Sequence, residues 1–219
     1  MQPQPYNRQP ESSIPNAVFA LLIINGLVFA AQQFAPREWF GQASLDLVTV
    51  YFGLWPFNNP DWLPQFMPWQ LVTYSFLHDT QMLAHIAINM FVLFMLGRDV
   101  ERFMGTRRFL VYYFTCVVGA GFVQLVVAKI TNGNYPTIGA SGGVFGILLA
   151  YGMMFPNRMI LLLIPPIPMK AKYLVVLLGL IEIFLGVSGL ATGVAHFAHL
   201  GGMFFGFILI RYWSRVRRR

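Results

Sequence analysis

Charged residues are scarce in this 219-residue sequence: Asp, Glu, Lys and Arg make up 11%, whereas 57% of the residues are hydrophobic. A soluble domain ordinarily carries about 25% charged residues. So few charges cannot cover a surface that faces water, and lipid is therefore the expected solvent. A spanning helix takes about 20 mostly apolar residues, so roughly six such helices and their loops would use the whole chain.

Cysteine and acidic residues are rare as well. The single cysteine, Cys116, excludes an internal disulfide and fits no spacing of metal ligands. We expect it to pack as a small buried apolar side chain. The eight Asp and Glu residues leave a net charge of +7. The Lys and Arg residues separate apolar runs and form no stripe with interleaved aromatics, which argues against nucleic-acid binding.

Apolar runs indicate an all-α integral membrane protein with six spanning helices. The runs cover residues 14–34, 84–96, 109–128, 141–155, 173–190 and 194–212. They form one predicted membrane domain, residues 14–212, between a polar N-terminal tail, residues 1–13, and a basic tail, residues 213–219.

A long connection over residues 35–68 is unusual because it holds eight Trp, Tyr and Phe residues. Aromatic side chains at this density suit the headgroup level of a bilayer. We expect the segment to lie at the interface, with a small globular surface loop as the alternative.

The basic residues predict an orientation. With six spans, 13 of the 15 Lys and Arg residues fall on the side of the two termini, and only Arg37 and Lys129 fall on the other. Basic residues concentrate on the cytoplasmic side. We therefore expect a multi-pass membrane protein with both termini in the cytoplasm.

A serine surrounded by small residues opens the short fourth run. Ala140, Gly142 and Gly143 leave Ser141 open to close approach, and the first N–H groups of a helix have no intrahelical partners. A serine nucleophile is presented in this way. The alternative is a glycine-rich loop that leads into a closely packed membrane helix.

Further polar side chains lie at the depth of Ser141. His85 and Asn89 share a face of the second run, and His196 and His199 begin the sixth. Polar groups at membrane depth indicate function. One histidine can act as general base, while His85 and Asn89 can donate to an oxyanion. No aspartate lies nearby, which suggests a Ser–His pair without a third member.

His199 is the preferred base. Gly202 and Gly206 follow it on one stripe, in a G-x-x-x-G pattern that allows close helix packing. If that stripe packs on the small face beginning at Gly142, His199 faces Ser141. His196 is then expected one turn nearer the surface, in contact with water or a loop.

Glu182 stands alone in the fifth run, where insertion scales give a cost of about 2.5–3.5 kcal/mol. We expect it to hydrogen-bond a neighbouring helix, and a proton relay is the alternative.

Taken in order over residues 69–206, these motifs resemble those of the rhomboid intramembrane serine proteases of the compact six-helix bacterial type. The family's G-x-S-G matches residues 139–142, and its H-x-x-x-N matches residues 85–89. Its helix-ending G-x-x-x-E-x-x-x-G matches Gly97, Glu101 and Gly105. Gln70 departs from relatives that have arginine after the tryptophan.

The resemblance implies a six-helix rhomboid-like bundle and an intramembrane serine endopeptidase of the bacterial inner membrane. It makes Ser141 the nucleophile and His199 the base, with His85, Asn89 and Gly139 supporting the oxyanion and Gly142, Gly202 and Gly206 serving close packing. The implied substrates are single-span membrane proteins, and neither a cofactor nor a metal is expected. The alternatives are a rhomboid-like protein that binds membrane clients without cutting them and a proton-linked transporter.

Overall fold

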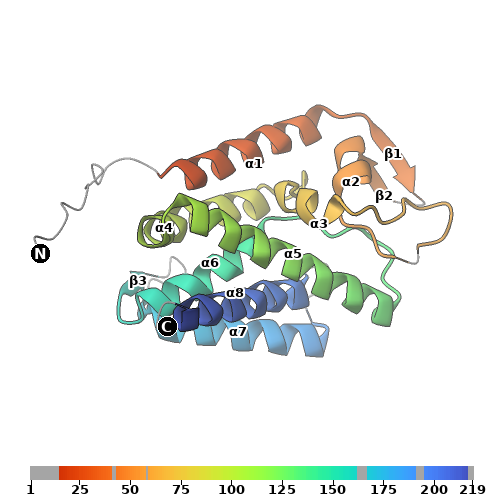
Figure 1. The fold of residues 1–219 in the computed structure, drawn as a ribbon. Coiled ribbons are helices and arrows are strands. Elements are labelled where there is room, and N and C mark those ends of the chain that lie inside the picture. Colours follow the sequence, from red (N-terminus) through yellow and green to blue (C-terminus); the bar gives the residue numbers. More distant parts are fainter. Residues whose placement is uncertain (1–14, 41–42, 58, 162–166, 191–194, 217–219) are drawn as a thin grey trace, which may run out of the picture.

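The computed structural model describes residues 15–40, 43–57, 59–161, 167–190 and 195–216 (Figure 1). The predicted N-terminal tail, residues 1–13, lies outside these residues. Of the predicted C-terminal tail, residues 213–216 continue the last helix. The long helices are α1 (Asn16–Phe34), α4 (Leu83–Met104), α5 (Thr106–Thr131), α6 (Ser141–Met154), α7 (Ala171–Ser188) and α8 (His196–Val216).

Shorter elements fill two of the connections. Between α1 and α4 lie the hairpin of β1 (Arg37–Phe40) and β2 (Ala43–Asp46), then α2 (Leu47–Phe52), α3 (Gln70–Thr73) and the 3-10 turn η1 (Tyr74–Phe76). Between α6 and α7, β3 (Met159–Leu161) pairs antiparallel with β4 (Pro168–Lys170). Neither hairpin was predicted, because apolar periodicity gives little signal in strands of three or four residues.

The described chain is a mostly helical, multi-pass membrane protein. Helices α1, α4, α5 and α7 are long and apolar enough to cross a membrane, and α6 is a shorter apolar helix of 14 residues. Helix α8 has 21 residues but carries two histidines and two arginines, so its composition is less apolar. Helix α4 runs past the predicted end at residue 96, since Arg98, Asp99 and Glu101 continue it.

Helix α6 occupies the centre of the bundle. It packs against α4, α5, α7 and α8, and α8 also contacts α5 and α7 (Figure 1). Its buried residues occur on every side, as expected for a helix that is apolar all round. The short helix that begins at Ser141 is therefore enclosed by longer ones.

Glycines let α6 approach its neighbours. A Cβ on Gly143 would stand 2.5 Å from Tyr113 of α5, and one on Gly146 would stand 2.4 Å from the Sγ of Cys116. Cys116 is fully buried, as predicted. On the other side, a Cβ on Gly202 of α8 would stand 2.0 Å from the carbonyl oxygen of Gly142. No residue larger than glycine fits at these contacts without moving a helix.

Glu101 joins α1 to α4. Its two carboxylate oxygens accept hydrogen bonds from the backbone N–H groups of Ala17 and Val18, at 3.0 and 2.8 Å, and the Thr106 hydroxyl donates to it at 2.7 Å. The first N–H groups of a helix otherwise lack partners, and a negative charge there is favoured by the helix dipole. Gly105, at φ +81°, ends α4 directly after this joint.

The segment over residues 35–68 folds back onto the bundle. The Asp46 carboxylate caps α2 at Thr49, whose hydroxyl accepts from the Gln32 amide of α1 at 2.9 Å. The same Gln32 pairs with the backbone of His78 through two hydrogen bonds, of 2.9 and 3.1 Å. Gln70 accepts a hydrogen bond from the backbone N–H of Trp55. The segment is therefore anchored to α1, and α1 is bonded in turn to the loop that precedes α4.

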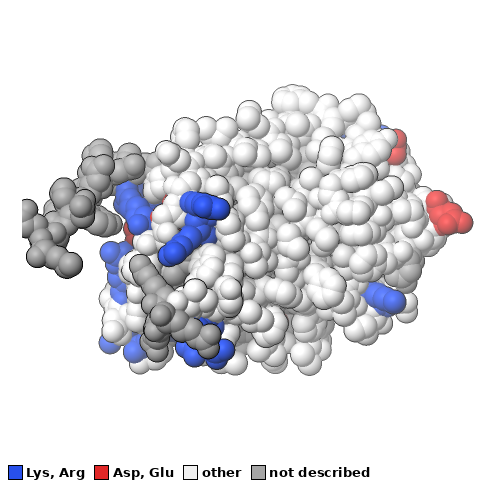
Figure 2. Space-filling model, in the orientation of Figure 1, with Lys and Arg blue, Asp and Glu red and all other residues white. Residues whose placement is uncertain are grey.

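Several aromatic side chains of this region remain exposed, among them Trp39, Trp62 and Trp69. Their placement at a bilayer interface stays a prediction. Figure 2 shows most of the visible Lys and Arg side chains at one end of the molecule, where α1 begins and α8 ends, and acidic residues at the other end. This asymmetry agrees with the distribution that the sequence predicts.

We predict that Glu101→Ala lowers the free energy of unfolding by about 2–4 kcal/mol, because two buried N–H groups and a hydroxyl lose a charged acceptor. Denaturant titration in mixed micelles measures this change. Glu38→Ala is the control, since Glu38 is exposed on β1, and a surface change is usually worth less than about 0.5 kcal/mol. Equal stability of the two variants would show that Glu101 does not stabilise the contact between α1 and α4.

His78 predicts a dependence of stability on pH. Burial, aided by the neighbouring His85 ring, lowers the pKa of His78 from its ordinary 6.5 to about 3. The unfolded chain therefore binds a proton below pH 6.5 that the folded protein excludes, so stability is full above pH 6.5 and falls toward pH 3. The loss approaches about 1.4 kcal/mol for each pH unit.

His78→Phe keeps a planar ring but cannot take the proton. Thermal unfolding should therefore show a smaller fall in Tm between pH 7.5 and pH 5.5 for His78→Phe than for the wild type. Because the two proteins differ at residue 78 alone, the difference between the two falls isolates His78. An equal fall in both proteins would contradict the prediction.

Candidate active site

The loop before α6 holds Ser141 in place from two sides. Thr137 exchanges backbone hydrogen bonds with Leu54, at 2.9 and 3.0 Å, and the Gly139 N–H donates to the carbonyl of Tyr74 at 3.0 Å. Gly139 has φ +124°, a conformation that side chains rarely adopt. Ser141 is the first residue of α6 and is partly buried. A glycine is therefore required to turn this loop into the helix.

His199 reaches Ser141 from α8. Its Nε2 lies 2.7 Å from the Ser141 Oγ, and its ring stacks on Phe145 of α6 with centroids 4.3 Å apart. His199 is buried. Gly202, one turn later, is the residue that touches the backbone of Gly142. The close approach of α8 to α6 thus brings the histidine to the serine.

The predicted glycine stripe divides between two neighbours. Gly202 packs on Gly142 of α6, whereas a Cβ on Gly206 would stand 2.4 Å from the Tyr112 hydroxyl of α5. The sequence placed the whole stripe on α6. The difference arises because α8 lies in the groove between α5 and α6 and contacts both.

A carboxylate that the sequence did not connect to the site lies on the far side of His199. The Nδ1 of His199 is 2.9 Å from the Glu182 Oε2 of α7, so the predicted Ser–His pair has a third group. The expectation that Glu182 bonds a neighbouring helix is confirmed. Its isolation in an apolar run was the available signal, but periodicity does not tell which neighbouring helix an acidic residue faces.

The expectation for His196 was wrong. It is buried, not near the surface, and its Nδ1 lies 2.7 Å from the same Glu182 oxygen. Gly186 of α7 explains this burial, because a Cβ there would stand 3.1 Å from Phe197 and 3.3 Å from the Cβ of His196. The small residue lets α7 close over the start of α8.

His85 approaches the serine from α4. Its Nδ1 accepts a hydrogen bond from the Asp79 N–H at 3.3 Å, which in a neutral ring leaves the proton on Nε2. That Nε2 lies 2.8 Å from the point where a Cβ on Gly139 would stand, and the Ser141 Oγ lies 3.7 Å from the same point. A donor and a nucleophile therefore face one small opening that the absent side chain leaves.

Asn89 is buried one turn after His85. Its amide donates to the carbonyl oxygen of His85 at 2.8 Å. This bond engages one N–H of the amide within α4, and the predicted contact with an oxyanion stays a prediction.

Glu182, His196 and His199 could also hold a metal ion, since they offer ligand atoms within 4.8 Å of one another. Two histidines and a glutamate form one of the zinc ligand sets. Here both Nδ1 atoms meet one carboxylate oxygen at hydrogen-bond distance. Protons on the two Nδ1 atoms satisfy this arrangement without a metal.

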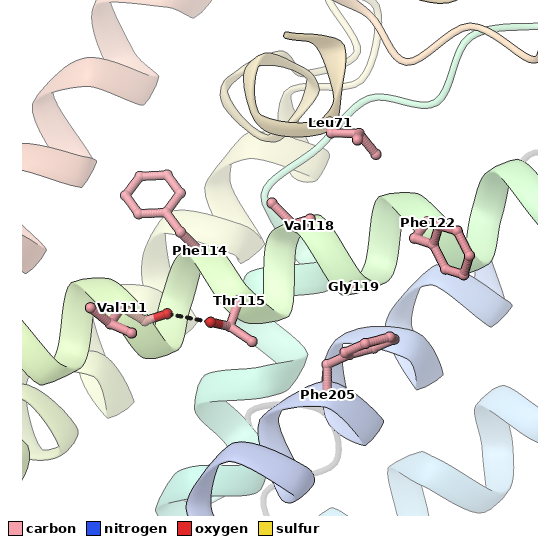
Figure 3. Close-up of a pocket in the computed structure, with 8 residues that line it drawn as sticks. All are labelled: Leu71, Val111, Phe114, Thr115, Val118, Gly119, Phe122 and Phe205. Carbon is pink, nitrogen blue, oxygen red and sulfur yellow. Dashed lines mark hydrogen bonds between the residues drawn. The ribbon is translucent and has the colours of Figure 1, made fainter. Parts of the chain in front are cut away.

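An apolar groove elsewhere in the molecule takes no part in this site. It lies between α3, α5 and α8, and Figure 3 shows Leu71, Phe122 and Phe205 around it. The Thr115 hydroxyl in its wall donates to the Val111 carbonyl of its own helix at 2.7 Å. The groove therefore presents apolar surface, as a face toward lipid does.

Comparison with known proteins identifies the family. Residues 65–216 match the Rhomboid domain, which is more than half of the chain. The chain belongs to the rhomboid family. This rhomboid is 29% identical over 178 residues to the presenilin-associated rhomboid-like protein A, mitochondrial, of Danio rerio, covering 80% of this chain and 43% of that protein.

Two further relatives extend the comparison. Rhomboid protein 1, mitochondrial, of Saccharomyces cerevisiae is 28% identical over 206 residues, covering 92% of this chain and 54% of that protein. Rhomboid protease GluP of Bacillus subtilis is 30% identical over 141 residues, covering 64% and 25%. This rhomboid spans about half or less of the length of these relatives, which come from mitochondria and from a bacterium.

If this rhomboid cleaves a model membrane substrate at Ser141, we predict that Asn89→Ala lowers the turnover by less than the factor of about 10²–10³ that loss of one oxyanion donor typically costs. His85→Ala should cost that full factor, because the His85 Nε2 faces the opening beside Ser141. Labelling of Ser141 by a small fluorophosphonate should persist in Asn89→Ala.

Asn25→Ala is the matched control. The buried Asn25 amide donates to the Leu21 carbonyl four residues back, at 2.7 Å, in the same way as Asn89 but in α1. Loss of turnover in both asparagine variants would indicate a packing role, and full turnover in Asn89→Ala would exclude an oxyanion role.

Proposed function

We propose that this rhomboid is an intramembrane serine endopeptidase that cleaves transmembrane or juxtamembrane segments of single-span membrane proteins. The observation that carries the proposal is the 2.7 Å contact between the Ser141 Oγ and the His199 Nε2 inside an apolar bundle. The family membership supports it, and one relative is named a rhomboid protease.

The reaction follows from this geometry. The Ser141 Oγ attacks the carbonyl carbon of the scissile bond while its proton passes to the His199 Nε2. The carbonyl oxygen gains negative charge in the opening beside Gly139, where the His85 Nε2–H and the Ser141 backbone N–H can donate to it. His199 returns the proton to the leaving amine, and water then releases the acyl group from the serine by the same steps.

The substrate must come from the bilayer. Helix α7 packs on α6 and α8, while Val176, Leu180 and Phe184 on its outer face are exposed. A substrate helix that approaches from lipid hides its carbonyls in its own hydrogen bonds, so the cleaved segment has to unwind before Ser141 can reach a carbonyl carbon. Substrates with helix-destabilising residues near the cut bond fit this requirement.

We propose six spans, in which α6 and α8 cross beside the four helices that are long and apolar enough to span a membrane, with both termini in the cytoplasm of a bacterium. Lys and Arg at the end where α1 begins and α8 ends support this orientation. The described helices from α1 to α8 then form one membrane domain.

Two other functions fit less well. A client-binding protein without catalysis has no need of a serine and a histidine at hydrogen-bond distance. A proton-linked transporter would draw on Glu182 and the histidines, but it is typically built from repeated halves with broken helices, and the sequence has no such repeat.

We predict that Ser141→Ala abolishes both proteolysis of a model single-span substrate and fluorophosphonate labelling. His199→Ala should reduce both by about 10²–10⁴-fold, because the serine loses its general base. Ser188→Ala is the control, since Ser188 is exposed at the end of α7 and donates within its own helix. Cleavage at the wild-type rate by Ser141→Ala would remove Ser141 from the mechanism.

A further inference from the structure

Glu182 makes polar contacts that packing of an apolar helix does not require. It is buried on α7, and one of its carboxylate oxygens, Oε2, meets two histidines of α8. A buried carboxylate with two imidazole partners beside a candidate nucleophile is not explained by packing alone, since an apolar side chain would join the two helices at lower cost.

We propose that Glu182 is a positioning residue for His199, and that His196 in turn positions Glu182. This rests on the proposed function and makes its Ser–His pair part of a hydrogen-bond network of four residues from α6, α7 and α8. The network consists of Ser141, His199, Glu182 and His196.

The first effect of Glu182 is on the tautomer of His199. The Glu182 Oε2 at 2.9 Å from Nδ1 holds a proton on that nitrogen, which leaves a lone pair on Nε2. The Ser141 hydroxyl at 2.7 Å can then donate to Nε2. Without the carboxylate, the proton can move to Nε2, where it makes the histidine a donor and unable to act as base.

The second effect of Glu182 is on the positive charge that forms on His199. When the Ser141 proton moves to Nε2, His199 becomes an imidazolium, and the ionised Glu182 lies next to the new positive charge. The proton stays on the imidazole until it passes to the leaving amine, so Glu182 gains no proton. An ion pair in a place of low dielectric stabilises this intermediate more than it would in water.

The third effect is that of His196. Its Nδ1–H donates to the same Oε2 at 2.7 Å, which fixes the carboxylate oxygen between two donors. The close packing of α7 and α8 at Gly186 holds His196 there. His196 thus acts on Glu182, whereas the Nε2 of His199 makes the contact with Ser141.

The other titratable groups near His199 are few in the described chain. His85 faces the site from α4 and interacts with His199 electrostatically. From α5, Tyr112, Tyr113 and Cys116 lie at Gly206, Gly143 and Gly146, and the Tyr74 hydroxyl of η1 lies at Gly142 and donates to the Val117 carbonyl. Glu182 is therefore the acidic group in contact with the His199 ring among the described residues.

The experiment compares Glu182→Gln, Glu182→Asp and His196→Ala with wild type in detergent micelles. Glu182→Gln should lower kcat by about 10–10³-fold with KM changed by less than about threefold. The acid limb of its kcat/KM profile should move to lower pH by about one unit, because the imidazolium has lost its ionic partner. Glu182→Asp should restore part of the rate and return the limb toward the wild-type position.

His196→Ala should lower kcat by less than Glu182→Gln does, and its acid limb should not move to lower pH, since the carboxylate remains. Thermal unfolding of each variant separates a loss of folding from a loss of positioning. A wild-type kcat in Glu182→Gln would overturn the proposal. So would a lowered kcat with an unmoved acid limb, because that pattern indicates a structural role.

A second measurement does not depend on proteolysis. In protein with 15N-labelled histidine, the His199 resonances, assigned with His199→Ala, should show the Nδ1–H tautomer in wild type and a shift toward Nε2–H in Glu182→Gln. The Nε2–H tautomer in wild type would overturn positioning. Failure of the proposed function is distinct, because it shows as proteolysis that survives Ser141→Ala or as no proteolysis by the wild type.

Discussion

The contact between Gly202 of α8 and Gly142 of α6 is the constraint on which the candidate site depends. A Cβ on Gly202 would stand 2.0 Å from the Gly142 carbonyl oxygen, so the two backbones touch. Dispersion and close packing hold membrane helices together, since lipid offers little hydrophobic drive between them. The serine precedes one of these glycines by one residue and His199 precedes the other by one turn. The packing contact therefore also sets the distance from Nε2 to Oγ.

A second constraint comes from the apolar surroundings, in which each polar group needs a partner. Glu101 meets the free N–H groups of α1, and Gln32 pairs with the backbone of His78. Glu182 meets two imidazoles. These three residues come from different helices, and each ties its helix to another part of the chain. Buried polar side chains thus fix the relative positions of helices that apolar packing alone leaves free to rotate or slide.

Much of this arrangement could be predicted from the sequence. The long apolar runs predicted the helices, and the glycines around Ser141 together with His85 and His199 predicted which helix ends would meet. The helix boundaries were less accurate, because charged residues such as Arg98 and Glu101 extend α4 beyond its apolar run. The two hairpins were missed because short strands carry little periodic signal.

The partners of Glu182 could not be predicted, for a geometric reason. Apolar residues surround it in α7, so no polar stripe shows which way that helix is rotated about its axis. We expected His196 to lie near the surface because it stands one turn before His199. Instead, α7 covers that turn at Gly186. Sequence reasoning could align residues by depth in the membrane, whereas the contacts around a helix axis required the packed structure.

The two ring nitrogens of His199 make contacts that depend on different helix packings. Its Nε2 contact depends on the rigid glycine packing of α6 and α8, whereas its Nδ1 contact depends on α7. Helix α7 is exposed along Val176, Leu180 and Phe184, and its main helix contacts are with α6 and α8. A displacement of α7 would therefore break the carboxylate contact while leaving the serine and histidine in place. The distance between the Ser141 Oγ and the His199 Nε2 is thus set by the interior of the bundle, whereas the contact at Nδ1 depends on a helix with an exposed outer face.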